Sequence, residues 1–310
     1  MYPKTIEITE VGTRDGLQSE SRFIPTDQKI KFIKGFISAG LRRIEATSFV
    51  SPRAVPQLAD AAGLVSATRG QGAKIAALVP NAKGAARALE AGADEMVAFI
   101  SASESHSRTN LNMPIADALK AVEQVAQIAD GGGRTFRSAI AVAFGCPFEG
   151  DVEPAAVSAI AGTLKGMGVR TITLGDTTGM ASPRHVENVC GRLLEDHPDL
   201  RLTLHFHNTR GLGLVNVMTG LKLGIDSYES ASGGLGGCPF AAGATGNICT
   251  EDLVYLMAEL GIETGIDFDG VVAVAKEMER AVGRELPGQL IRSGPRSKLH
   301  SIEAVRRAVG

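Results

Sequence analysis

The sequence has no tryptophan and few other aromatic residues, with 11 phenylalanines and 3 tyrosines among its 310 residues. It also lacks a strong excess of charge, because 32 basic side chains face 34 acidic ones and the formal net charge is −2. Proteins that bind nucleic acid usually present a basic groove or a platform of aromatic rings. The composition therefore argues against nucleic acid as a partner.

Cysteine is also scarce, which rules out a disulfide framework for a chain of this length. The four cysteines are not spaced as in a zinc finger; they are Cys146, Cys190, Cys238 and Cys249. No apolar run is long enough to span a bilayer, and the first residues enter an alternating strand without a recognisable leader. We therefore expect a cytoplasmic protein with no membrane partner.

The sequence instead contains a regular alternation of short β-branched runs and amphipathic helical stretches. Strands are predicted at residues 5–12, 42–49, 74–80, 95–102, 135–144, 170–176, 200–207 and 227–233. Helices are predicted near residues 26–39, 53–69, 83–91, 115–130, 153–166, 182–196, 212–223 and 249–260. This alternation is typical of parallel strands with crossover helices, and the repeat of such units predicts an α/β fold, a (β/α)8 TIM barrel.

Local signals support these helix limits. Four helices are followed by a glycine that we expect in a left-handed C-terminal cap: Gly40, Gly92, Gly168 and Gly224. Ser182 followed by Pro183 is typical of an N-cap and the first helical position. A doubly wound open sheet is the alternative fold, but the first turn lacks the G-x-G-x-x-G pattern of nucleotide-binding sheets.

We predict one domain over residues 1–310. The barrel would occupy about residues 1–262, and a C-terminal helical extension would occupy about 263–310.

Polar residues gather where the predicted strands end. They are Arg14, Asp15, Glu45, Asp176, His205 and His207, with Cys238 and Asn247 in the glycine-rich loop after the eighth strand. Each has a structural interpretation when taken singly, such as a turn, a helix cap or a buried ion pair. Catalytic residues of a barrel lie at this end of the strands, so their joint placement indicates an active site.

The pair His205 and His207 is the clearest indication of a metal site. Residues two apart on a strand share a face, so both imidazoles would point into the barrel. Asp15 would supply a carboxylate, and Asn247 could add a carbonyl oxygen. Such a nitrogen and oxygen set suits a divalent cation such as Mg2+ or Mn2+. Zinc stays open as an alternative.

Several motifs together resemble the 3-hydroxy-3-methylglutaryl-CoA (HMG-CoA) lyase family. They occur in family order from residue 10 to about 257: EVGTRDGLQSE, IEATSFVSP, GCPFEG, LGDTTGMASP, HFHNTRG and GLGGCPFAAGATGNICTEDLVYL. The segment GLGGCP is the most specific, because related condensing enzymes of the same superfamily lack the cysteine loop.

The resemblance implies a divalent-metal-dependent carbon–carbon lyase. It would cleave HMG-CoA to acetyl-CoA and acetoacetate by retro-Claisen chemistry, as in leucine degradation. Its partner would be an acyl-CoA substrate, and the family suggests a homodimer or a higher homo-oligomer.

The resemblance also implies roles for individual residues. Asp15, His205, His207 and Asn247 would hold the cation, which would make the substrate hydroxyl easier to deprotonate. The remaining catalytic roles fall to three residues. Arg14 would stabilise charge on the thioester oxygen, and Glu45 would hold Arg14. Cys238 would protonate the enolate of acetyl-CoA, alone or together with a second group.

Substrate contacts are expected from Arg14, Gln18, Arg137, Asp176 and Arg210. Asp176 would act by orienting water, the metal ligands or Arg14. Arg137 is given a supporting role, with a structural salt bridge as the alternative.

The chain departs from the family pattern after the seventh strand, where Asn208 and Arg210 replace the usual Asp and Tyr. Arg210 could bind a carboxylate or a phosphate of CoA, or lie in solvent. Three alternatives therefore stay open. They are a lyase for a related thioester such as citramalyl-CoA, a Claisen-type condensing acyltransferase, and a barrel that binds a ligand without catalysis.

Overall fold

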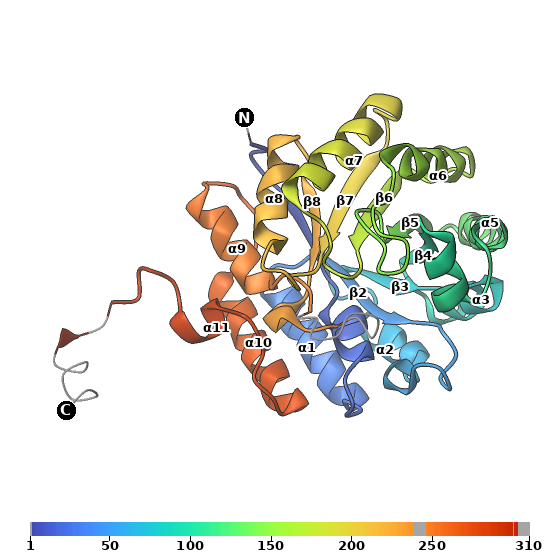
Figure 1. Ribbon diagram of the computed structural model, residues 1–310. Coiled ribbons are helices and arrows are strands. Elements are labelled where there is room, and N and C mark those ends of the chain that lie inside the picture. The colour runs from blue at the N-terminus through green and yellow to red at the C-terminus, as the bar shows by residue number, and fades with distance from the viewer. Residues whose placement is uncertain (1, 238–245, 300, 303–310) are drawn as a thin grey trace.

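A computed structural model describes residues 2–237, 246–299 and 301–302. Its parallel strands form a closed barrel in chain order, and the first strand is hydrogen-bonded to both the second and the eighth (Figure 1). The strands are β1 (Glu7–Glu10), β2 (Arg43–Ser48), β3 (Lys74–Leu78), β4 (Glu95–Ser101), β5 (Thr135–Ala141), β6 (Thr171–Asp176), β7 (Arg201–Phe206) and β8 (Ser227–Ser230). The predicted (β/α)8 barrel is confirmed.

A ring of helices surrounds the strands (Figure 1). The helices that follow the successive strands are α1 (Thr26–Ser38), α2 (Ala61–Thr68), α3 (Ala82–Ala91), α5 (Ile115–Gly131), α6 (Pro154–Gly166), α7 (Pro183–Asp196), α8 (Gly213–Lys222) and α9 (Thr250–Glu259). Shorter or additional elements are η1 (Gly12–Gly16), η2 (Pro56–Leu58), α4 (Glu104–His106), η3 (Ser107–Leu111), η4 (Ser232–Gly234), α10 (Phe268–Val282) and α11 (Leu290–Ser293).

The predicted helix caps are confirmed. The four cap glycines have φ values of 99°, 84°, 90° and 83°, a region that is costly for residues with a Cβ. Ser182 accepts a hydrogen bond from the backbone N–H of His185, and Pro183 begins α7. These caps end or begin the helices within a residue or two of the predicted limits.

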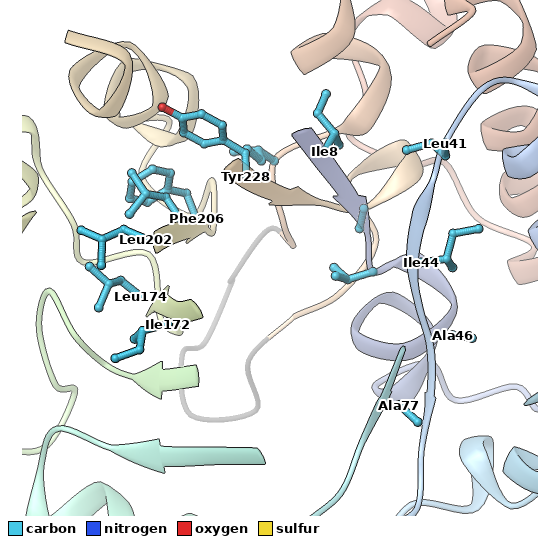
Figure 2. Packing of buried hydrophobic residues seen from close by; sticks show 14 of the residues in the cluster. Ile8, Leu41, Ile44, Ala46, Ala77, Ile172, Leu174, Leu202, Phe206 and Tyr228 are labelled. Carbon is cyan, nitrogen blue, oxygen red and sulfur yellow. The ribbon is translucent and has the colours of Figure 1, made fainter. Parts of the chain in front are cut away.

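The alternation of side chains along each strand divides the barrel into an apolar outside and a polar lumen. On β7, Leu202, Leu204 and Phe206 are buried under the helices, and Figure 2 shows Leu202 and Phe206 in this packing with Tyr228 of β8 nearby. The intervening residues Thr203 and His205 belong to the lumen. The same division places Glu45 between Ile44 and Ala46 on β2. The core therefore lies between strands and helices, while polar groups collect inside the barrel.

The C-terminal part of the chain adds α10 to the helix ring, where it packs against α1 and α9. The approach to α1 is close, because a Cβ on Gly35 would lie 2.6 Å from Cγ2 of Val274. Beyond α11 the described chain extends away from the barrel (Figure 1). The single domain with an extension from about residue 263 stays a prediction. Within the described residues, no helix is both long and apolar enough to cross a bilayer.

Candidate functional site

Arg14 and Asp15 lie on a tight turn, whereas the sequence placed them at the end of the first strand. β1 stops at Glu10, and η1 follows as a short π-helical turn. The carbonyl oxygen of Val11 accepts hydrogen bonds from the backbone N–H groups of Arg14, Asp15 and Gly16 at 3.1, 2.8 and 3.3 Å. This turn directs both side chains over the mouth of the barrel. They therefore lie at the predicted end of the barrel, but on a π-helical turn and not on the strand itself.

The buried carboxylate of Glu10 anchors this turn to η4 and to the start of α9. It accepts hydrogen bonds from the backbone N–H of Gly12 at 2.8 Å, from the N–H and Oγ of Ser232 at 2.9 Å each, and from Oγ1 of Thr250 at 2.7 Å. Burial raises the pKa of Glu10, and these donors lower it only in part. Glu10 was not predicted as a site residue, because β1 already alternates polar and apolar residues and a second glutamate does not stand out.

Asp15, His205 and His207 converge above the barrel lumen, and we refer to them as the metal triad. Nε2 of His205 lies 3.2 Å from Nε2 of His207, while Oδ2 of Asp15 lies 3.9 and 3.7 Å from these nitrogens. One donor atom from each residue can be chosen so that all lie within 4.8 Å of one another. The first strand region and the seventh strand thus meet as the sequence led us to expect.

The chemistry of these donor atoms fits a divalent cation. Two facing imidazole nitrogens at this distance can share one proton at most, and a carboxylate oxygen faces the same space. Nδ1 of His207 and Oδ1 of Asn247 are buried and make no hydrogen bond within the described part of the chain. Such groups are costly unless they have a partner. A cation held by Oδ2 of Asp15 and Nε2 of both histidines would suit the facing donor atoms. Nδ1 of His207 lies on the other side of its ring and would stay outside that set.

Asn247 is beside the triad, but it turns its amide nitrogen toward Asp15. Nδ2 donates to Oδ2 of Asp15 at 2.8 Å and to the carbonyl oxygen of Leu235 at 2.9 Å. An amide flip would be needed to direct Oδ1 at a cation bound to Asp15. Its role as a ligand therefore stays a prediction.

Charged neighbours keep Asp15 ionised. Burial alone would raise the pKa of this carboxyl, but Arg14 and the two histidines outweigh it and hold the pKa well below its usual range. Nη1 of Arg14 donates to Oδ1 of Asp15 at 2.6 Å, which leaves Oδ2 toward the histidines. The carboxylate is thus present as a ligand in its charged form at neutral pH.

Buried ion pairs and two contacts of His205 link the triad into a closed loop of polar side chains, which we call the ion-pair ring. Its members in order are Arg14, Glu45, Arg137, Glu229, His205 and Asp15. The Glu45 oxygens lie 2.5 Å from Nε of Arg14 and 2.7 Å from Nη2 of Arg137. A register shift between Glu45 and Thr47 on β2 marks a bulge beside the site, where bulges often redirect a side chain.

The ring favours the charged forms of Arg14 and Glu229. Burial alone would raise the pKa of Glu229, but Arg137 and His205 lower it far below its usual range. Burial would lower the pKa of Arg14, and Glu45 and Asp15 raise it instead. Every ring member except Glu229 was predicted as a site residue from the sequence. The sequence SYES held one signal for Glu229, because side chains alternate along a strand and this acid shares the inward face of the barrel with Ser227.

A cavity of about 1260 Å3 opens above the ring and is lined by the metal triad and by Arg14, Gln18, Glu45, Arg137, Gly236 and Gly237. Nε2 of Gln18 donates to Oδ1 of Asp15 at 3.1 Å. Arg137 reaches the cavity floor, but its described hydrogen bonds all go to protein groups. Cys238 follows Gly237 in the chain and lies outside the described residues, so its catalytic role stays a prediction.

The profile of the HMGL-like family matches residues 5–278. A curated HMG-CoA lyase from Bacillus subtilis is 42% identical over 289 residues, which cover 93% of this chain and 97% of that protein. The chain belongs to the HMG-CoA lyase family. A mitochondrial relative from Bos taurus is 40% identical over 91% of this chain and 87% of that protein.

Solved structures agree with this membership of the HMG-CoA lyase family. The structure of an HMG-CoA lyase from Acenitobacter baumannii, in complex with coenzyme A and 3-methylmalate, superposes with a TM-score of 0.92. It is 42% identical in sequence and covers 96% of this chain and 98% of that one.

Asp176 and Arg210, two other residues predicted to bind substrate, do not line the cavity. Asp176 ends β6, and its Oδ1 accepts hydrogen bonds from the backbone N–H groups of Met180 and Ala181 at 2.7 and 2.9 Å. Nη1 of Arg210 donates to the carbonyl oxygens of Thr178 and Gly179 at 3.0 and 2.7 Å. Neither side chain is among the residues that line the cavity. Both organise the loop after β6, and their contact with substrate stays a prediction.

Proposed function

We propose that this protein is a divalent-metal-dependent carbon–carbon lyase that cleaves HMG-CoA to acetyl-CoA and acetoacetate. The observation that carries the proposal is the convergence of the metal triad at the base of a large cavity. Family membership supports the reaction, because curated relatives named HMG-CoA lyase match most of the chain. Coenzyme A and a hydroxy diacid bound to a relative support an acyl-CoA substrate.

The triad would hold the cation, with Asn247 as a proposed fourth ligand. A bound Mg2+ or Mn2+ would supply Lewis-acid chemistry, which lowers the cost of removing the proton from the tertiary hydroxyl of the substrate. Oδ2 of Asp15 is the oxygen that faces the imidazoles, since Oδ1 is bonded to Arg14 and Gln18. Oδ2 also accepts a hydrogen bond from Nδ2 of Asn247 at 2.8 Å, so a cation would share this oxygen with Asn247 or replace that contact after an amide flip.

Arg14 is proposed to stabilise the charge that develops on the thioester oxygen. In the cleavage, solvent water takes the hydroxyl proton, the O–H electron pair forms the new carbonyl of acetoacetate, and the electron pair of the broken C2–C3 bond passes to the acetyl-CoA enolate. Glu45 holds the guanidinium through Nε, and Arg14 lines the cavity. A guanidinium that is already fixed beside the developing oxyanion needs little reorganisation during the reaction. We propose Cys238 as the acid that then protonates the enolate carbon.

The proposal is tested with purified protein, Mg2+ or Mn2+, and HMG-CoA. Chromatography of the products should show acetyl-CoA and acetoacetate in equal amounts, and chelation should abolish both. A parallel assay with citramalyl-CoA measures pyruvate, and turnover of that thioester alone would change the substrate assignment. A third assay supplies acetyl-CoA and 2-oxo acids and measures free thiol. Thiol release there, without cleavage of either thioester, would replace the lyase with a condensing acyltransferase.

We also propose that the protein acts in the cytoplasm, in leucine degradation, as a homodimer or larger homo-oligomer. A cytoplasmic relative from Rattus norvegicus, 39% identical over 96% of this chain, supports the location. Light scattering after size exclusion tests the assembly.

A further inference from the structure

Glu229 lies beside His205 at the bottom of the site, on the neighbouring strand and in register with it. Its Oε2 lies 2.9 Å from Nδ1 of His205. Its Oε1 accepts hydrogen bonds from Nη1 of Arg137 and from Oγ1 of Thr173. The side chain is buried, so both carboxylate oxygens are engaged by fixed protein groups.

This contact determines which nitrogen of His205 carries a proton. A carboxylate that is paired with a guanidinium accepts hydrogen bonds and donates none. The proton between the two residues therefore belongs to Nδ1, and in the neutral ring the lone pair belongs to Nε2. Nε2 is the nitrogen that faces Asp15 and His207. We propose that Glu229 is a positioning residue that fixes the tautomer and the ring orientation of His205 for the cation.

The inference deepens the proposed function and rests on its metal site. His207 provides a contrast within the same triad, because its Nδ1 has no hydrogen-bond partner among the described residues. Glu229 therefore acts on one imidazole of the pair. Second-layer carboxylates of this kind orient histidine ligands and make them more basic.

Arg137 keeps Glu229 in place and also limits the damage that a substitution would cause. Its guanidinium bonds to Glu45 at 2.7 Å and to Glu95 at 3.2 Å, in addition to Glu229. A neutral residue at position 229 would leave Arg137 paired with two acids. We therefore expect Glu229→Gln to fold.

The test measures Mn2+ binding to chelator-treated protein by calorimetry or electron paramagnetic resonance. With its oxygen on Arg137, the Gln side chain turns its NH2 group toward Nδ1 of His205 and favours a proton on Nε2. We expect Glu229→Gln to raise the Kd for Mn2+ by about 10-fold to 100-fold relative to the wild type. A Kd unchanged within about threefold would overturn the proposal.

Ser227→Ala is the matched control. Oγ of Ser227 lies 2.9 Å from Oγ1 of Thr203, so this change breaks a buried contact between the same two strands, two residues before Glu229 and His205. We expect its Mn2+ affinity to equal that of the wild type. Equal weakening in both variants would show a general effect of strand damage and would contradict a specific role for Glu229.

A second measurement needs no variant at position 229. In chelated wild-type protein labelled with 15N-histidine, nuclear magnetic resonance should show neutral His205 with its proton on Nδ1, with the signal assigned by its loss in His205→Gln. A proton on Nε2 would overturn the inference while leaving the lyase proposal intact. Wild-type protein that binds no Mn2+ would instead overturn the metal site itself.

Discussion

Asp15 links the turn that carries it to the proposed cation. One of its oxygens is bonded to Arg14 and Gln18, and the other faces the two histidines. Few substitutions of Asp15 could separate its role in the turn from its role as a metal ligand. Replacing the carboxylate by an amide removes the charge and keeps the shape.

We expect Asp15→Asn to raise the Kd for Mn2+ by about 100-fold or more and to reduce kcat/KM at least as much. Asp60→Asn is the control, because Asp60 also forms a buried ion pair, with Nζ of Lys29 at 2.8 Å. Both aspartates have 12% of their side chain exposed. That variant should lower thermal stability without changing Mn2+ affinity. Calorimetry measures binding, and normal affinity in Asp15→Asn would remove this residue from the site.

Glu251 predicts a dependence of stability on pH. It accepts hydrogen bonds from the N–H of Gly233 at 3.1 and 3.0 Å, and burial raises its pKa from 4.5 to about 8. The folded state then holds a proton that the unfolded state releases. The resulting stability is complete below about pH 4.5 and is lost as the pH rises through about 8.

Glu251→Gln should remove this part of the pH dependence. We expect the Tm of the wild type to fall more than that of Glu251→Gln between about pH 6 and pH 9, by at least a few degrees. Calorimetric melting curves at several pH values measure the difference. Parallel curves for the two proteins would show that the carboxyl is ionised in the folded state.

At the scale of elements, the backbone segments on either side of residues 238–245 pack directly on each other. A Cβ on Gly246 would lie 2.3 Å from the carbonyl oxygen of Gly234 and 2.4 Å from that of Gly236. The carbonyl of Gly246 also accepts a hydrogen bond from the N–H of Asn208 at 3.0 Å. The loop after β8 is therefore joined to the end of β7 through main-chain contacts.

Gly246→Ala should force these segments apart and displace Asn247 from Asp15. We expect lower thermal stability and a loss of kcat/KM of about tenfold or more, measured on the purified variant. Gly63→Ala is the control, since Gly63 lies in α2 with nothing near its missing Cβ. That change should stabilise the protein by about 0.5–1 kcal/mol. Wild-type behaviour of Gly246→Ala would mean that the segments have room to separate.

The order of the main elements and most of their limits could be predicted because they depend on local signals. The helix predicted near 53–69 was too long, because α2 begins only at Ala61. α7 begins one residue after its Ser182 cap, as expected. The differences have local three-dimensional causes. β5 ends at Ala141 because Val142 has a φ of 52°, and β1 ends at Glu10 because the chain turns under its carboxylate. Neither cause is visible as a pattern in the sequence.

The candidate site was only partly predictable for a similar reason. Side chains at strand ends could be grouped from the barrel hypothesis alone, and Asp15, His205 and His207 do meet. The pairing of Glu229 with His205 depends on the register of β7 and β8, which periodicity leaves undetermined. Residues that act through a neighbour, such as Glu229, could therefore be identified only from the structure.

At the scale of the whole molecule, a cation in the triad would join distant parts of the chain. Ligand that binds only the folded state stabilises it, by about 2.7 kcal/mol at a concentration 100 times its Kd. We therefore expect Mn2+ to raise the Tm of chelated protein, and Asp15→Asn to lose most of this rise. Calorimetric scans with and without Mn2+ measure it, and an equal rise in both proteins would place the ion elsewhere.

Closure of the barrel has a consequence for how the protein is made. β1 pairs with β8, so the first strand to leave the ribosome waits for the last before one of its edges is covered. Until about residue 230 has been translated, the nascent chain carries an open sheet edge that other chains can pair with. Cells that produce this protein rapidly would therefore depend on chaperones during synthesis, and premature termination before β8 has been translated should yield aggregates.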